Sequence, residues 1–182
     1  SRVSGLMFLA LWVWFSLPLE FLWLSLRKSL NKKFPKNLKK KTETKNKKIL
    51  ILHGWDASPE DHWFSKAKEL FEKQGWVTFI PQLPGNYFPK KDDWLKVIED
   101  LQVDENWVLI GHSLGGVAIL KYLEIAKKPI TQAILIATPF EEMEFTPIQN
   151  FFENDFDWKM IKNNCPRFDI VNETDDSVVD LE

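Results

Sequence analysis

The strongest chemical signal in the sequence is a serine between two glycines, Gly-His-Ser-Leu-Gly at residues 111–115. An apolar run at 107–110 precedes it and an amphipathic stretch follows it, which predicts a strand, a sharp turn and a helix. Such a turn strains the serine backbone and holds the hydroxyl above the sheet, where it can attack an acyl group. We predict a nucleophile elbow with Ser113 as the catalytic nucleophile and the Leu114 N–H as an oxyanion donor. A merely tight turn is the alternative.

A second oxyanion donor is expected in the loop after the first strand, His-Gly-Trp-Asp at 53–56. Gly54 has no side chain, so the backbone can approach a substrate closely there. The Trp55 N–H is the predicted donor. The sequence therefore predicts that this loop lies beside Ser113, with Gly54 as a substrate-binding residue.

None of the three histidines is expected to act as the general base. His53 is interpreted as a structural imidazole that hydrogen-bonds its own loop, and His62 as a helix-surface or core residue. His112 is expected to leave the strained turn on another side and pack beneath the site. Three dispersed histidines and the single Cys165 make no metal-ligand set, and no phosphate loop or dinucleotide fingerprint is present. We therefore expect neither a metal nor a cofactor.

A carboxylate is expected at the end of a later strand, because the triad in such a fold follows the order nucleophile, acid, histidine. Asp175 and Asp176 follow the apolar run 168–171 by a short turn. One of them would orient the imidazole and stabilise its charged form, while the other caps the loop. Their position in the sequence does not favour either one as the triad acid. The alternative is that both are solvated acids in a turn and have no catalytic role.

After residue 48, short apolar runs alternate with amphipathic stretches, which is typical of a parallel sheet covered on both faces. One helix is expected to begin after Ser58 with Pro59 in its first turn. Two more are expected at 92–101 and directly after Ser113. The predicted fold class is α/β, a three-layer sandwich with a mostly parallel sheet. Strands are predicted at 49–53, 77–80, 107–110, 133–137 and 168–171.

The charge is unevenly divided along the chain, although its formal net value is only −2. Residues 27–48 hold eleven Lys and Arg against one acid, whereas residues 49–182 hold twelve basic and twenty-four acidic side chains. The acidic body excludes nucleic acid as a partner, except for the basic segment.

Residues 6–26 form an apolar run long enough to cross a hydrocarbon layer of about 30 Å. The basic cluster that follows would hold that end in the cytoplasm. We predict a hydrophobic helix at 1–26 that spans or lies on a membrane, a basic linker at 27–48 and a cytoplasmic domain at 49–182. Membrane contact is expected through residues 6–41. The alternative is that this region is a translated stretch upstream of the true start and has no function.

Several blocks resemble one known group of enzymes. These are the small serine hydrolases of the α/β-hydrolase superfamily that include retinoblastoma-binding protein nine and its bacterial relatives. The resemblance runs from Lys48 to the end and implies Asp176 over Asp175 as the triad acid. The matching blocks are the serine motif, His-Gly-Trp-Asp-Ala-Ser at 53–58, Asp-His-Trp-Phe at 61–64, Pro-Gln-Leu-Pro at 81–84 and Asp-Trp-Lys-Met-Ile-Lys at 157–162.

One departure from the family pattern concerns the general base. In the family the catalytic histidine follows the acid after one more helix and strand, whereas no histidine follows His112 in this sequence. We expect the sequence to be truncated before that histidine, with the C-terminal part of the fold missing. A degenerate hydrolase is the alternative. The truncated chain is expected to be nearly inactive and to leave a sheet edge uncovered.

The sequence thus predicts a serine hydrolase that acts on a small acyl-containing substrate, a carboxylic ester, thioester or amide, through a Ser-His-Asp triad and an acyl-enzyme. A catalytically inactive, membrane-tethered binding module with the same fold is the main alternative. An acyltransferase using the same serine is another. The phenylalanine-rich segment 139–157 is expected either to cover the serine as an apolar lid or to pack on the sheet edge.

Overall fold

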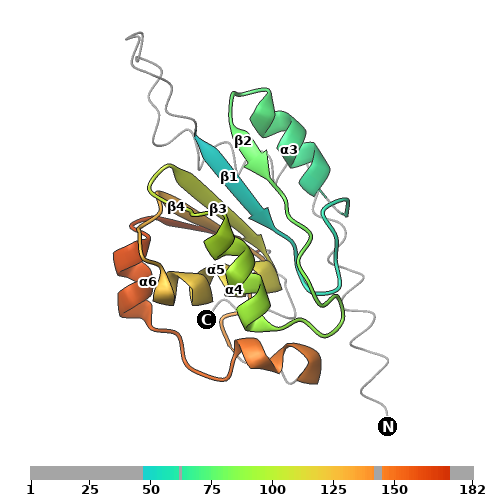
Figure 1. The fold of residues 1–182 in the computed structure, drawn as a ribbon, viewed down its shortest axis with the longest axis vertical. Helices are drawn as coiled ribbons and strands as arrows, with labels where there is room; N and C mark the ends of the chain where they lie inside the picture. Colours follow the sequence, from blue (N-terminus) through green and yellow to red (C-terminus); the bar gives the residue numbers. More distant parts are fainter. Residues whose placement is uncertain (1–46, 62, 142–144, 173–182) are drawn as a thin grey trace.

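The computed structural model describes residues 47–61, 63–141 and 145–172 (Figure 1). Strands and helices alternate along these residues. The elements, in chain order, are β1 (Lys48–Leu52), α3 (Phe64–Glu72), β2 (Val77–Phe79), α4 (Lys91–Asp100), β3 (Trp107–His112), α5 (Leu114–Ile125), β4 (Gln132–Ile136), the 3-10 helix η2 (Thr146–Phe151), α6 (Trp158–Asn164) and β5 (Phe168–Val171).

The five strands form one parallel sheet in the order β2-β1-β3-β4-β5. From β1 the chain moves outward to β2, and it then returns to β3 on the other side of β1. The carboxyl ends of β1 and β3 therefore lie side by side where the winding direction reverses. In open α/β sheets this switch point is where ligands bind.

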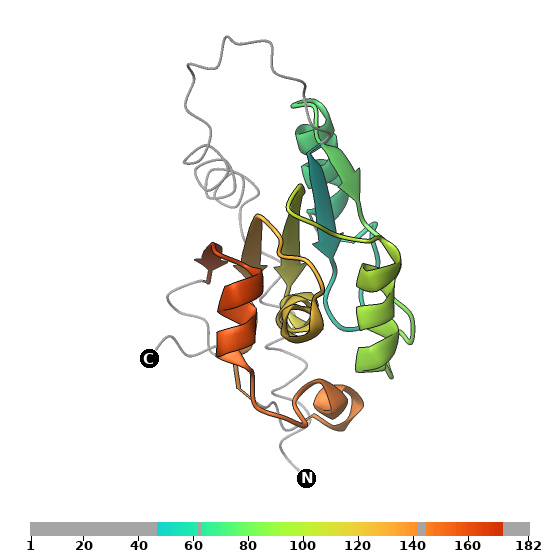
Figure 2. The ribbon, with the colours of Figure 1, turned by 60° about the vertical axis from the view of Figure 1, so that its left-hand side comes forward.

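Side chains alternate between the two faces of the sheet, because successive Cβ atoms of a strand point to opposite sides. Ile49 and Ile51 pack in one cluster with Phe64 of α3. Leu50 and Leu52 pack in a larger cluster with α4, α5 and α6. Figures 1 and 2 show α3 on one side of the sheet and these three helices on the other. The predicted α/β fold, with a parallel sheet between helices, is confirmed.

The start of α3 differs from the prediction. Ser58 was expected to cap a helix with Pro59 in its first turn, but the chain forms a turn there and α3 begins at Phe64. The Asp61 carboxylate accepts a hydrogen bond from the Ser58 N–H at 2.6 Å, and the Asp61 N–H donates to the Ser58 carbonyl at 3.2 Å. Because these bonds close a local ring, the residues that resemble a helix start stabilise a turn instead.

Some predictions concern residues outside the described ranges. These are the hydrophobic segment 6–26, the basic linker up to residue 46, His62, Asp175 and Asp176. Among the residues whose structure is described, no helix combines the length and the apolar character needed to span a bilayer.

Candidate active site

Ser113 lies between the last residue of β3 and the first residue of α5. Its φ of 51° and ψ of −124° lie in a region that residues with a side chain rarely adopt. The backbone is held there from both sides: the Ser113 N–H donates to the Ile136 carbonyl at 2.9 Å, and the Gly116 N–H donates to the Ser113 carbonyl at 2.9 Å. The residue remains partly exposed. A strained and accessible serine therefore stands at the carboxyl end of β3.

Glycines allow α5 to start directly against the sheet. A Cβ on Gly111 would overlap the backbone of Gly116, and a Cβ on Gly115 would lie 2.5 Å from the Leu52 carbonyl oxygen. No side chain fits at either position without moving backbone atoms. The first helical N–H group, that of Leu114, has no acceptor within the helix and lies at the positive end of its dipole. This arrangement suits the stabilisation of negative charge next to Ser113.

The loop after β1 reaches the same point. A Cβ on Gly54 would lie 3.2 Å from Ser113 Cβ and 3.4 Å from His112 Nδ1. The structure thus brings Gly54 and Ser113 together, as the sequence predicted for a loop beside the serine. Trp55 follows Gly54, and its indole Nε1 donates to the Tyr87 carbonyl at 2.9 Å.

His53 holds this loop through both ring nitrogens. Its Nδ1 lies 2.8 Å from the Gly54 carbonyl oxygen, which can only accept, and its Nε2 lies 3.0 Å from the Leu83 N–H, which can only donate. The proton is therefore on Nδ1, and the ring is neutral. The edge of the buried ring also packs against Trp94, with centroids 5.9 Å apart. His53 thus hydrogen-bonds its own loop, as expected for a structural imidazole.

His112 directs its ring toward α3. The ring packs edge-on against Phe64, with centroids 5.8 Å apart, and against Trp63 at 6.3 Å. This is the predicted position beneath the site. Within the described part of the chain, neither His53 nor His112 is hydrogen-bonded to Ser113.

The end of β5 lies at the same edge of the sheet as Ser113. Val171 pairs with Ile136, and the Ala137 N–H donates to the Val171 carbonyl at 2.9 Å. The residues after β5 therefore start two strands away from Ser113. Asp175 and Asp176 themselves lie outside the described residues.

Asp169 is the one acid within β5, and its contacts are structural. Arg167 Nε donates to its Oδ2 at 3.0 Å, and the Gln132 amide donates to the same oxygen. Asp169 pairs in register with Ile134, two residues before the end of β4. The carboxylate therefore ties β4 to β5 within the sheet.

The described residues whose pKa differs from its ordinary value are Lys47 and residues of the helices. Hydrogen bonds from Lys73 and Lys66 lower the pKa of the exposed Glu69 carboxyl on α3 to about 2. Burial raises the pKa of the Tyr122 hydroxyl on α5. Among the described residues, no three His, Cys, Asp or Glu side chains gather closely enough to hold a metal ion.

Comparisons with known proteins agree with this geometry. Residues 49–182 match the model of the serine hydrolase family. The chain belongs to that family. YdeN of Bacillus subtilis (strain 168) is 29% identical over 138 residues, which are 73% of this chain and 73% of YdeN. Serine hydrolase RBBP9 of Rattus norvegicus is 28% identical over 130 residues, which are 70% of this chain and 65% of RBBP9.

A solved structure supports the fold of this serine hydrolase chain. The crystal structure of the ydeN gene product from B. subtilis superposes with a TM-score of 0.69 and 27% sequence identity. The match covers 74% of this chain and 75% of that chain. The resemblance to small serine hydrolases with the α/β-hydrolase fold is confirmed, and it supports a hydrolase function.

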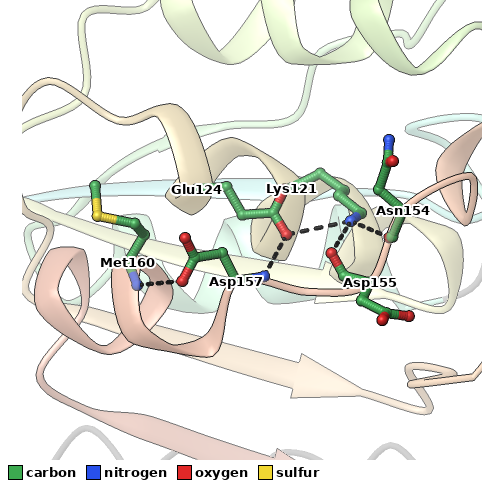
Figure 3. Close-up of polar contacts among 6 residues, drawn as sticks. All are labelled: Lys121, Glu124, Asn154, Asp155, Asp157 and Met160. Carbon is green, nitrogen blue, oxygen red and sulfur yellow. Dashed lines mark hydrogen bonds and ion pairs between the residues drawn. The ribbon is translucent and has the colours of Figure 1, made fainter.

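The sequence analysis missed a buried cation on α5, Lys121, which is only 4% exposed. Its Nζ donates to the carbonyl oxygens of Asn154 at 2.8 Å and Asp155 at 3.3 Å (Figure 3). It also pairs with Glu124 Oε1 at 3.1 Å and lies 4.4 Å from the centroid of the Phe156 ring. Lys121 thus anchors the segment between η2 and α6 to the helix that begins beside Ser113.

The same contacts continue into α6. Glu124 Oε1 accepts a hydrogen bond from the Asp157 N–H at 3.0 Å, and the Asp157 carboxylate caps α6 by accepting from the Met160 N–H at 3.0 Å. One signal for this network was present in the sequence. Lys121 is the single charged residue between Leu114 and Leu123, and a charge within a buried apolar helix needs a partner.

Proposed function

We propose that Ser113 is the nucleophile of a serine hydrolase that cleaves a carboxylic ester, a thioester or an amide. The observation that carries this proposal is the backbone conformation of Ser113, with φ 51° and ψ −124° at the junction of β3 and α5. A strained conformation persists only where its surroundings enforce it, and such residues cluster at active sites. The loop at Gly54, where an added Cβ would lie only 3.2 Å from Ser113 Cβ, places a second backbone segment beside the serine.

In the proposed mechanism, Ser113 Oγ attacks the carbonyl carbon while its proton passes to an imidazole. The carbonyl oxygen becomes an oxyanion, with the N–H groups of Leu114 and Trp55 as proposed donors. The tetrahedral intermediate then breaks the bond to the leaving group, which takes the proton from the imidazolium. Water, deprotonated by the same imidazole, attacks the acyl-enzyme and releases the acid and the free serine.

We propose that this imidazole comes from residues beyond Glu182, because in the family that the sequence resembles the histidine follows the acid. His53 and His112 also have structural contacts of their own. Asp176 is the proposed carboxylate that orients it. The proposal is supported by the position of the end of β5, where the Val171 carbonyl accepts from the Ala137 N–H. The residues that follow β5 therefore begin at the edge of the sheet where Ser113 lies. Without the imidazole, the 182-residue chain is expected to retain only the residual catalysis of triad-deficient enzymes, about 10³-fold over water.

Labelling with a fluorophosphonate probe tests the role of Ser113. The 182-residue chain and a chain extended past Glu182 are each compared with their Ser113→Ala variants. We expect the extended chain to be labelled roughly 100-fold faster than the shorter one, because a general base contributes about that much. Labelling is expected to be lost in Ser113→Ala and unchanged in the control Ser65→Ala, an exposed serine on α3. Equal labelling of Ser113→Ala and the parent would overturn the assignment.

A non-enzymatic binding module is the second candidate function. The observation that favours it is that the two described histidines, His53 and His112, hold or pack against neighbouring elements and neither is positioned as a base for Ser113. An extended chain that supplies no histidine, together with an unlabelled Ser113, would support the module. Acyl transfer differs from hydrolysis only in the second step, so product analysis with an added alcohol or amine separates the two activities.

We also propose that residues 6–41 contact a membrane and leave the hydrolase domain on the cytoplasmic side. The proposal rests on the apolar run and the basic cluster that follows it. In a density gradient, the full chain is expected to float with vesicles of phosphatidylcholine and phosphatidylserine. A chain that begins at Lys47 is expected to remain in the bottom fraction without the vesicles. Equal flotation of the two chains would contradict the proposal.

A further inference from the structure

Three aromatic rings from three different loops meet one another. Trp55 follows β1, Tyr87 lies between β2 and α4, and Phe145 lies between β4 and η2. The centroid of the Trp55 ring is 4.7 Å from those of Tyr87 and Phe145, and the latter two are 6.2 Å apart. We call these three residues the aromatic cluster. All three loops leave the carboxyl ends of strands, the edge of the sheet at which Ser113 stands.

The aromatic cluster is adjacent to Ser113 through Gly54. The Cα atoms of Gly54 and Trp55 are about 3.8 Å apart, as in any trans peptide, and the Cβ position of Gly54 lies 3.2 Å from Ser113 Cβ. The hydrogen bond from Trp55 Nε1 to the Tyr87 carbonyl at 2.9 Å fixes the indole in its orientation. The cluster is therefore preorganised next to the serine.

The cluster is not buried in the way that core rings are. Trp55 and Phe145 are partly buried, and Tyr87 is 39% exposed. Tyr87 also contacts Phe88, which is 70% exposed, with ring centroids 5.1 Å apart. An open apolar surface beside a reactive group is typical of a substrate-binding site.

We propose that the aromatic cluster binds an aromatic ring of the substrate, so that Ser113 acts preferentially on esters or amides that carry an aryl group. This inference rests on the proposed function. The Trp55 plane is tilted by 57° to Tyr87 and by 75° to Phe145, so the cluster presents ring faces and ring edges together. Aromatic rings attract one another in offset-stacked and edge-to-face contacts, which saturated chains cannot reproduce.

Binding is measured first without chemistry, on the Ser113→Ala variant of the full chain. The probe is phenylacetamide, and acetamide is its matched control without the ring. The readout is the NMR signal of the Trp55 indole N–H, assigned by its loss in Trp55→Phe. We expect phenylacetamide to shift this signal in a saturable way and acetamide to leave it unchanged.

Two variants test whether the ring contacts account for the binding. Phe145→Leu, which keeps an apolar side chain but removes a ring, is expected to weaken phenylacetamide binding roughly tenfold. Ile125→Ala is the matched control, because Ile125 is 52% exposed and lies at the far end of α5, roughly 18 Å along the helix from Ser113. Thermal unfolding checks the fold, and Tyr87→Leu provides a second ring deletion. An unshifted indole signal, or equal binding by Phe145→Leu and Ile125→Ala, would overturn the inference.

Turnover by the extended chain then assigns the ring to one side of the scissile bond. Benzyl acetate carries the ring on a leaving group about as basic as methoxide, methyl phenylacetate carries it on the acyl group, and methyl acetate carries none. We expect kcat/KM to be roughly tenfold higher for one of the aryl esters than for methyl acetate, and Phe145→Leu to remove the difference. A labelled Ser113 with equal kcat/KM for all three esters defeats the aryl preference alone. An unlabelled Ser113 defeats the proposed function, while the indole signal still decides whether a ring binds.

Discussion

Ser113 combines a proposed nucleophilic role with a strained backbone. A positive φ at a residue with a Cβ costs of order 1–3 kcal/mol, and only the surrounding contacts maintain it. Glycine adopts this region without that steric cost. The structure therefore predicts that stability and function oppose each other at this position.

Two substitutions at Ser113 make this opposition measurable. Both Ser113→Gly and Ser113→Ala remove the hydroxyl, but only glycine also relieves the strain at φ 51°. We expect Ser113→Gly to be more stable than Ser113→Ala by about 1 kcal/mol in urea unfolding, after the larger loss of backbone entropy for glycine. Equal midpoints with equal slopes would show that the conformation is not strained.

Gly54 is predicted to control access to the serine. In Gly54→Ala the new methyl group would lie 3.2 Å from Ser113 Cβ, closer than an ordinary contact. We expect the rate of fluorophosphonate labelling to fall roughly tenfold, because a small displacement of reacting groups is costly. The measurement is the labelling rate alongside a thermal unfolding curve.

Gly75→Ala is the matched control for Gly54→Ala. Gly75 has φ 83°, and apart from its chain neighbours no atom lies within 4 Å of its Cβ position. We expect this variant to lose about 1 kcal/mol of stability through backbone strain and to keep the labelling rate of the parent. Slower labelling in both variants to the same extent would mean that stability, rather than crowding of Ser113, limits the reaction.

At the scale of elements, Lys121 joins α5 to the segment that precedes α6. Replacement by Met keeps the apolar stem but removes the Nζ donor from two backbone carbonyls and from Glu124, which then accepts only from the Asp157 N–H. Removing one partner of a buried ion pair costs about 3–5 kcal/mol, and we expect about 2–3 here because the Glu124 side chain keeps 20% of its surface exposed. Chemical denaturation measures the loss.

The exposed pair between Lys68 and Glu72 on α3 is the comparison for Lys121. Its charged atoms are 3.9 Å apart, and such surface pairs contribute at most a few tenths of a kcal/mol. Lys68→Met is therefore expected to leave the unfolding midpoint nearly unchanged. A similar loss in both variants would indicate that Lys121 acts only through its aliphatic stem.

The ion pairs of Glu69 on α3 predict one pH dependence. Lys73 and Lys66 lower the pKa of this carboxyl from 4.5 to about 2, so the folded state binds the proton more weakly than the unfolded state. Their stabilising contribution is present above about pH 4.5 and is lost as the pH falls toward 2. A carboxyl NMR titration is expected to give a midpoint near 2, and Lys73→Met is expected to raise it. A midpoint that Lys73→Met leaves in place would contradict this account.

Local patterns explain which elements were predictable. Apolar runs located the strands, most clearly the central strands β1, β3 and β4, which are buried on both faces. The predicted start of α3 was wrong because Ser58 and Asp61 hydrogen-bond to each other in a turn. A local pattern does not distinguish such a turn from a helix start, since the same residues can form either. The Lys121 network joins residues more than thirty positions apart, so no local pattern specifies its partners.

At the scale of the whole molecule, β5 is the outermost strand on its side of the described sheet. Ile170 on this strand is 55% exposed. An apolar outer strand favours association between molecules. We expect the 182-residue chain to self-associate in light scattering after size-exclusion chromatography, and Ile170→Lys to reduce this association. Unchanged association in Ile170→Lys would place the contact elsewhere.

The sequence alone was sufficient to predict that Gly54 and Ser113 meet, because the carboxyl ends of parallel strands share one edge. It did not reveal the aromatic cluster, which forms only when three loops of unrelated sequence converge. The choice between Asp175 and Asp176 came from the family resemblance and stays a prediction, since both acids lie outside the described residues.

The pairing of β1 with β3 also makes Ser113 a reporter of the folding reaction. Gly54 and Ser113 are 59 positions apart in the chain, and only the contact between these two strands brings them together. Long-range parallel pairing is slow compared with the formation of local helices. During refolding, the reactivity of this serine toward a quenchable probe should consequently lag behind the helical signal in circular dichroism, and the delay would time the closure of the central strand pair.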